Sequence, residues 1–166
     1  MTRHRTRRRG RVIAAVAMVV AAAWSAGSAS AETRSAVPNY RVVVTLSPAA
    51  ARTMATKREE IIVSASYYGE PTKTAKKEAD EMGQIDLGGE DVRLGSAGGT
   101  AAMVGKGFRA ARIVHVVGRE AHLNLNVYSA RRSGPDNLLD CDFFDDTVKL
   151  AESKPITIHC KLIGEN

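Results

Sequence analysis

The residues best suited to chemistry are three histidines outside the N-terminal segment: His115, His122 and His159. If Val117 pairs with His122 across a four-residue turn, His115 and His122 lie diagonally on one face of a hairpin. Diagonal neighbours are about 7–8 Å apart at the backbone, which two imidazoles can span around a metal ion. His115 and His122 are therefore candidate metal ligands, although no third ligand is evident and a one-residue register slip would separate them. An ordinary solvent-facing sheet surface is the alternative, and we expect no cofactor.

A row of polar side chains follows the same hairpin. His122, Asn124, Asn126 and Tyr128 alternate with apolar residues along residues 122–128. Successive side chains of a strand point to opposite faces, so these four share one face. Their amide, imidazole and phenol groups can donate or accept hydrogen bonds, which makes the row a candidate face for binding a ligand or partner.

Cys141 and Cys160 are the two cysteines of the chain. In an oxidising compartment they are expected to form a disulfide, which would close a loop of about 20 residues. Free thiols or a zinc pair are the alternatives, but the spacing matches no common metal motif. Both cysteines fall on the apolar faces of predicted strands, Cys141 with Leu139 and Phe143 and Cys160 with Ile158, which favours a buried structural bridge.

The segment around Cys141 is strongly acidic, with Asp140, Asp142, Asp145 and Asp146. Calcium needs six to eight oxygens arranged as a cage, and this spacing departs from the calcium-loop pattern. Charged residues also protect the edge strands of sheets against association. We therefore interpret the aspartates as the outward face and exit of an edge strand.

No arrangement of residues typical of an enzyme is evident. The chain contains no Gly-x-Ser-x-Gly, His-Glu-x-x-His or Ser-x-x-Lys motif. The neighbouring acids Glu59 and Glu60 would point to opposite faces of a strand, so they could not act on one bond and are interpreted as solvated charge. The sequence therefore favours a protein that is not an enzyme.

The net charge of +6 comes from the first 31 residues, which contain six arginines and no acid. The remaining residues carry equal numbers of acidic and basic groups, so they offer no general attraction to nucleic acid. An apolar run at residues 12–23 and the small residues Ala29 and Ala31 predict a cleavable export signal over residues 1–31. The run is too short for a typical membrane span, so the mature chain is expected to be periplasmic or extracellular and not membrane-spanning.

Period-two alternation of apolar and polar residues dominates the rest of the chain. The strands predicted from it lie at residues 40–46, 61–68, 100–104, around 139–143, and 156–162, with two hairpins at residues 85–94 (turn 88–91) and 112–128 (turn 118–121). Ser47 and Pro48 predict a short helix that runs to Lys57, because serine caps helix starts and proline fits the first helical position. Loops are predicted at residues 72–83, with one helical turn as an alternative, and at 131–137.

These elements predict a short polar leader at residues 32–39 and one domain at residues 40–166. The expected fold is all-β: an antiparallel β-sandwich of about seven to eight short strands with one short helix. A small closed β-barrel is the alternative.

The leading hypothesis is an exported, non-enzymatic β-sandwich that acts through protein contacts or as a cell-envelope accessory protein, with an unidentified protein partner in the envelope and no nucleic acid. A barrel-type carrier of a small apolar ligand is the second hypothesis. A metal-assisted enzyme using His115 and His122 is the third.

Overall fold

The computed structural model describes Met1 and residues 37–165. Apart from Met1, the predicted export signal lies outside the described residues, as do residues 32–36 of the predicted leader. The strands are β1 Tyr40–Leu46, β2 Ile61–Gly69, β3 Ile85–Leu94, β4 Gly99–Met103, β5 His122–Ser129, β6 Leu139–Cys141, β7 Phe144–Thr147 and β8 Ile156–Leu162. The helices are α1 Pro48–Lys57 and α2 Val148–Ser153, with 3₁₀ turns η1 Lys76–Glu78, η2 Ala110–His115 and η3 Val117–Arg119.

The strands form two four-stranded sheets, ordered β4-β1-β8-β6 and β3-β2-β5-β7. The predicted β-sandwich is therefore confirmed, and the described residues form no closed barrel. Every paired strand runs antiparallel to its neighbour except β1 and β8, which pair in parallel. None of the helices in the described part of the chain has the length and apolar character that a membrane-spanning helix needs.

The core lies between the two sheets and is built by the alternation visible in the sequence. The inward residues of one sheet include Val42 and Val44 of β1 and Ile158 of β8, all at most 2% exposed. The other sheet contributes a matching row from β2 and β5, with Leu123 and Leu125 fully buried. Burying one face of each strand is the main source of stability in this architecture.

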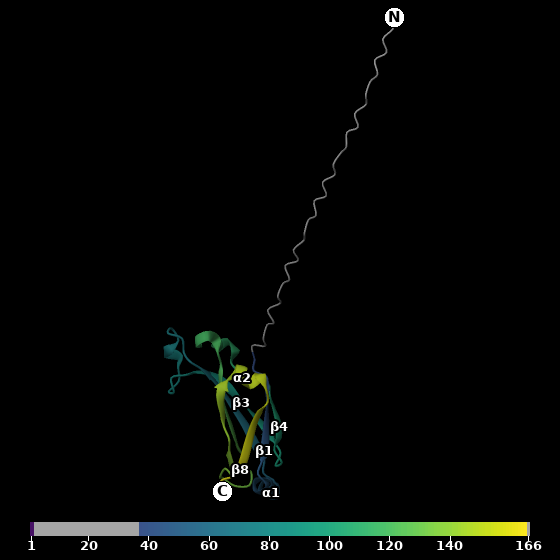
Figure 1. Ribbon diagram of the computed structural model, residues 1–166. Helices are drawn as coiled ribbons and strands as arrows, with labels where there is room; N and C mark the ends of the chain where they lie inside the picture. Colours follow the sequence, from purple (N-terminus) through teal and green to yellow (C-terminus); the bar gives the residue numbers. More distant parts are fainter. Residues whose placement is uncertain (2–36, 166) are drawn as a thin grey trace. The chain divides into compact units, whose positions relative to one another are not determined.

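The two α-helices lie at opposite ends of the sandwich (Figure 1). Helix α1 begins as expected: the Ser47 side chain accepts a hydrogen bond from Ala50 N at 3.0 Å, and Pro48 opens the first turn. Helix α2 was not predicted, so the expectation of one short helix is wrong. It begins where Thr147 caps the backbone N–H of Leu150.

The predicted hairpin at residues 85–94 is a single strand, β3, paired with β2 along its length. The register shifts where Tyr67 pairs with Gly88 and Tyr68 with Asp86, so Leu87 is an extra residue and Gly88 borders a bulge instead of forming a turn. Gly88 has a φ of 90°, and its N–H donates to the Asp86 side chain at 2.6 Å. Glycine allows this local bend without ending the strand.

The first strand of the predicted hairpin at residues 112–128 is also wrong. These residues form η2 and η3, while β5 pairs with β2 and β7 instead. The segment is bonded to residues 70–84: Thr72 N donates to the His115 carbonyl and Val117 N to the Glu70 carbonyl, both at 2.8 Å. Val116 is 2% exposed and makes a single bridge with Pro71. The apolar residue at this position is therefore explained by burial against a neighbouring segment and not by membership of a strand.

The acidic segment forms two strands instead of one, because the chain crosses from the first sheet at β6 to the second at β7. The crossing leaves Phe143 77% exposed, contrary to the expected face shared with Leu139 and Cys141. The predicted disulfide between Cys141 and Cys160 is confirmed. The two cysteines are direct partners in the antiparallel pair β6–β8, with Cα atoms 4.0 Å apart.

Candidate functional site

The predicted polar row lies on the outer face of β5. Leu123, Leu125 and Val127 point into the core, so His122, Asn124, Asn126 and Tyr128 face away from it. Strand β2 runs on one side of the row and β7 on the other. The cross-strand neighbours of the row are Tyr68 and Thr147 beside His122, Ser66 and Asp145 beside Asn124, Ser64 beside Asn126, and Ile62 beside Tyr128.

Side-chain bonds join three strands at one end of this face. The Tyr68 hydroxyl donates to Asp145 Oδ1 at 2.5 Å, and Asn124 Nδ2 donates to Asp145 Oδ2 at 3.1 Å. The Tyr68 ring stacks on His122, with centroids 5.4 Å apart and planes inclined by 28°. The hydrogen bond to Asp145 raises the pKa of Tyr68 to about 12, so the phenol stays a neutral donor at physiological pH.

Sequence reasoning missed Tyr68 and Asp145 as members of this site. The alternation along residues 61–68 does place Tyr68 on the outer face of its strand. However, the sequence carries no signal that β2 and β7 both flank β5, which is what brings these two residues to Asn124.

A polar cleft of about 500 Å³ opens on the same face. Ser66, Tyr68, Asn124 and Asp145 line it, together with alternate residues from Asp80 to Gly88. Gly89, the cross-strand partner of Ser66, also lines the cleft and contributes only its backbone. Its outer border contains the Arg109–Asp86 ion pair, with Nη1 and Oδ2 at 2.5 Å.

The candidate metal ligands are not on one hairpin. His115 belongs to η2, where its Nε2 lies 3.5 Å from a Glu78 carboxylate oxygen, whereas His122 stacks on Tyr68 in β5. The Nδ1 of His159 lies 3.1 Å from the Thr45 hydroxyl on the other sheet. Within residues 37–165, no group of three or more His, Cys, Asp or Glu side chains is arranged to hold a metal ion.

The aspartates of the acidic segment have separate partners. Asp140 lies 3.9 Å from the Lys161 ammonium group, Asp142 accepts from the His159 N–H, and Asp146 accepts from the Thr147 N–H. They are therefore spread over two edge strands and their exits instead of surrounding one point.

Glu59 is a buried carboxylate, contrary to the expectation of solvated charge, and is only 1% exposed. It accepts four hydrogen bonds, from Glu60 N, Arg132 N, Ser133 N and the Ser133 hydroxyl, at 2.6–3.1 Å. Burial acts to raise the pKa of Glu59, but the bonds from Ser133 and Arg132 outweigh it and lower the pKa to about 2. This carboxylate therefore fastens the loop at residues 130–137 to the start of β2.

A second polar network crosses the core. The hydroxyls of Tyr40 and Tyr67 lie 3.1 Å apart, and the Tyr67 hydroxyl donates to Glu90 Oε1 at 2.8 Å. Glu90 also accepts from Gly105 N at 2.6 Å, which ties the end of β4 to β3. Burial, more than any other cause, raises the pKa of both tyrosines, so they act as neutral links between the sheets.

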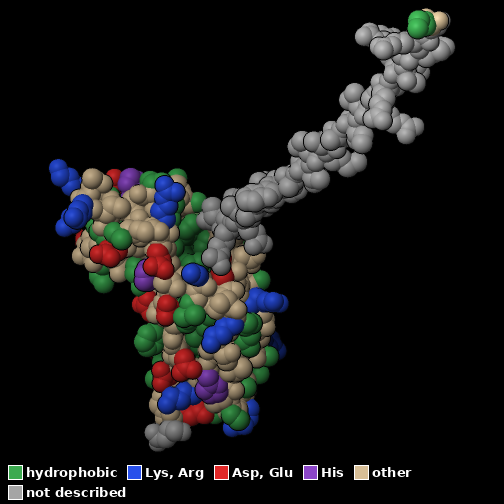
Figure 2. Space-filling model, turned by 45° about the horizontal axis from the view of Figure 1, so that its top comes forward, with side chains coloured by type: hydrophobic (Ala, Val, Ile, Leu, Met, Phe, Trp, Pro, Cys, Tyr) green, Lys and Arg blue, Asp and Glu red, His purple; other side chains and the backbone are tan. Residues whose placement is uncertain are grey.

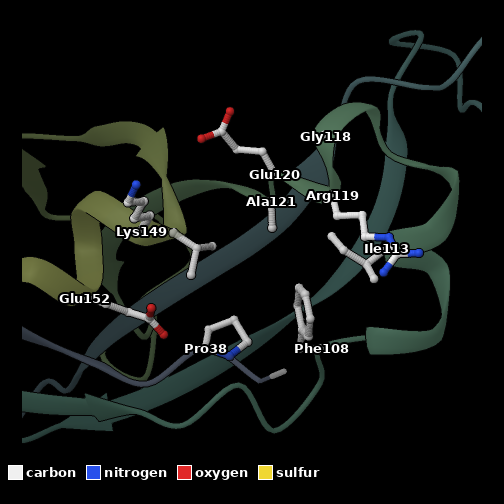
Figure 3. A pocket seen from close by; sticks show the side chains of 10 residues that line it. Pro38, Phe108, Ile113, Gly118, Arg119, Glu120, Ala121, Lys149 and Glu152 are labelled. Carbon is white, nitrogen blue, oxygen red and sulfur yellow. The ribbon is translucent and has the colours of Figure 1, made fainter. Parts of the chain in front are cut away.

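An apolar groove of about 480 Å³ lies at the α2 end of the sandwich (Figure 3). Phe108 and Ile113 lie side by side in this groove, with Pro38 next to Phe108. Val148 of α2 also lines it. Side chains of both charge signs, among them Arg119 and Glu152, surround it. Figure 2 likewise shows acidic and basic side chains interspersed over the visible face of the domain.

The edge of β4 differs from the other sheet edges in the described residues. Strands β3, β6 and β7 end their sheets and all carry charged side chains, whereas β4, with the sequence GTAAM, carries no charge and no proline. Residues 104–109 run along β3, and Arg109 N donates to the Leu87 carbonyl at 2.8 Å. Strand β4 pairs only with β1 in the described chain, which leaves one edge without a strand partner.

No known protein-family model, curated protein or solved structure matches this chain.

Proposed function

We propose that the protein is an exported, non-enzymatic β-sandwich that binds a protein partner of the cell envelope through the edge of β4. The N-terminal pattern of residues 1–31 supports export, and the Cys141–Cys160 bridge is compatible with an oxidising compartment. The partner contributes an extended segment, which adds to the first sheet as a fifth strand beside β4. Strand addition of this kind derives affinity from main-chain hydrogen bonds and specificity from alternate side chains.

The observation that carries this proposal is the unprotected character of β4. Natural proteins usually protect edges with charges, proline, bulges or covering loops, because a bare edge pairs readily with another strand. β4 buries Ala101 and Met103 in the core and exposes only Gly99 and the small side chains of Thr100 and Ala102. Figure 1 shows it at the border of the domain, with β1 between it and β8.

A hollow of about 510 Å³ beside β4 supports the same proposal. It lies against Ala102 and is bordered by Arg41 of β1 and by Glu152 and Lys154 at the end of α2. A strand added to β4 would place every second side chain on this side of the sheet. The hollow can receive one such side chain, and its charges favour a polar one.

The test is site-specific photocrosslinking in the native host, with a photoreactive amino acid at Ala102. The matched control is Thr157 of β8, which lies exposed on the same sheet but in a central strand. We expect an adduct with one protein species from position 102 and none from position 157. Adding Thr100→Lys should reduce the adduct by roughly tenfold, as expected when a charge costs about 1.4 kcal/mol of binding free energy.

Three outcomes would count against the proposal. Equal adducts from positions 102 and 157 would indicate non-specific contact. An adduct with a second copy of this chain would replace the proposal with self-association. An unchanged yield in the Thr100→Lys variant would show that the partner does not use the edge.

The hypothesis of a barrel-type carrier of a small apolar ligand assumed a closed barrel with an interior cavity. The described residues instead form a sandwich of two sheets. The apolar groove near Phe108 is open to solvent and has charges of both signs around it. No specific observation favours a second function over the proposed one.

A further inference from the structure

The polar cleft on the second sheet is a separate surface from the edge of β4, which belongs to the first sheet. Its central groups are Asn124 and Asp145, direct cross-strand partners on β5 and β7. Asp145 is held in place by two donors from neighbouring strands, Tyr68 and Asn124. A carboxylate oriented in this way is a prearranged acceptor for a ligand.

Asp145 and Asn124 can each form further hydrogen bonds besides those that join them to each other and to Tyr68. A carboxylate offers about four acceptor sites, and the bonds from Tyr68 and Asn124 use two of them on Asp145. Asn124 lines the cleft, and its amide gives one of its two N–H groups to Asp145, which leaves a second N–H and the carbonyl oxygen without a side-chain partner among the described residues. The exposed Ser66 adds a hydroxyl next to Asn124.

The charge and polarity of the cleft narrow the ligand class. Asp80, Asp86 and Asp145 line it with a single cation, Arg109, so an anionic ligand would be repelled. A purely apolar ligand would leave the amide and carboxylate groups unpaired, which is costly. A ligand that can only donate hydrogen bonds, such as an ammonium group, would leave the second N–H of Asn124 without an acceptor. The suitable ligand is therefore not anionic and carries adjacent groups that both donate and accept hydrogen bonds.

We infer that this cleft binds a neutral saccharide. Adjacent sugar hydroxyls donate to Asp145 and accept from the free N–H of Asn124, while an apolar C–H surface of the sugar packs against the Tyr68 side chain. The volume of about 500 Å³ is within the range of small-ligand sites and accommodates one or two sugar rings. The inference does not depend on the partner proposed for β4.

The test is a titration of the isotope-labelled mature protein with neutral oligosaccharides, followed by NMR. The probes are the di- to tetrasaccharides of glucose, mannose, galactose and N-acetylglucosamine. We expect at least one series to shift the signals of Ser66, Tyr68 and Asn124. Asn124→Ala and Tyr68→Phe should each weaken that binding by roughly tenfold. The first variant loses a hydrogen bond to the ligand, and the second loses the hydrogen bond that positions Asp145.

Asn126→Ala is the matched control, because Asn126 lies on the same face of the same strand but does not line the cleft. It should leave saccharide affinity unchanged, as should Thr100→Lys in β4, and every variant should keep the dispersed amide spectrum of the folded protein. Absence of shifts with every probe would overturn the inference, as would binding that Asn124→Ala leaves intact. Preferential binding of a lysine-rich peptide at the same residues would replace the saccharide with a cationic ligand.

Discussion

Removing the disulfide with Cys141→Ala and Cys160→Ala is expected to lower the free energy of unfolding by about 3 kcal/mol. The bridge joins residues 19 positions apart, and a loop of that size restricts the unfolded chain by roughly this amount. The native state depends on it as well, because β6 has only three residues and pairs solely with β8. Alanine is chosen because Cys160 is fully buried and a serine hydroxyl would need a partner there.

The measurement is urea unfolding of the protein, followed by circular dichroism. Wild-type protein in excess reductant is the internal control and should lose a similar amount of stability. Denatured protein that has not been reduced should not react with a thiol reagent. Two reactive thiols, or a double variant as stable as the wild type, would contradict the prediction.

The second large effect is expected for Glu59→Ala, a loss of about 3 kcal/mol in unfolding free energy. The substitution leaves the backbone N–H groups of Arg132 and Ser133, and the Ser133 hydroxyl, without their acceptor. Each buried donor left unpaired costs about 1–3 kcal/mol, reduced where water reaches the loosened loop. The loop at residues 130–137 should then show faster amide exchange, measurable by NMR.

Glu60→Ala is the matched control for this substitution. Glu60 is the adjacent residue, and it pairs with Arg93 and Arg132 on the surface, at 3.1 and 2.5 Å. Exposed ion pairs contribute about 0–1 kcal/mol, so this variant should unfold almost as the wild type does. Equal losses in the two variants would contradict the assigned role of Glu59.

Low pH should weaken the hydrogen bonds that Glu59 accepts from the loop at residues 130–137. The native pKa of Glu59 is about 2, below its ordinary value of 4.5, so the folded state favours the ionised carboxylate. Its contribution to stability is therefore complete above about pH 4.5 and is lost as the pH falls toward 2. The stability difference between the wild type and Glu59→Gln should shrink over that window, and a constant difference would contradict the assignment.

Local sequence patterns predicted those features of the fold that depend on near neighbours. The alternation of Val42, Val44 and their neighbours identified β1 because one face of a strand is buried whatever its partner is. Ser47 and Pro48 located the start of α1 because a helix cap acts within three residues. The two cysteines indicated a bridge because no third cysteine offers an alternative pairing.

The pairing of strands with one another was not predictable in the same way. Gly88 and Gly89 suit a turn as well as a bend within β3, and pairing with the long strand β2 decides between them. His115 carries the apolar neighbours of a strand, yet contact with residues 70–72 holds it in a 3₁₀ turn. Two local conformations of similar energy are separated here by contacts from distant residues.

The amino-acid pattern was enough to predict a β-sandwich domain with a balanced charge, one disulfide and a polar row along β5. The contacts of Tyr68 and Asp145 with Asn124, the burial of Glu59 and the position of β4 at an uncharged edge became evident only from the folded chain. The difference lies in the sequence separation of the residues involved. Alternation, capping and cysteine pairing are set by a residue's own type and near neighbours, whereas a cleft, a buried carboxylate and a free edge depend on which strands lie side by side.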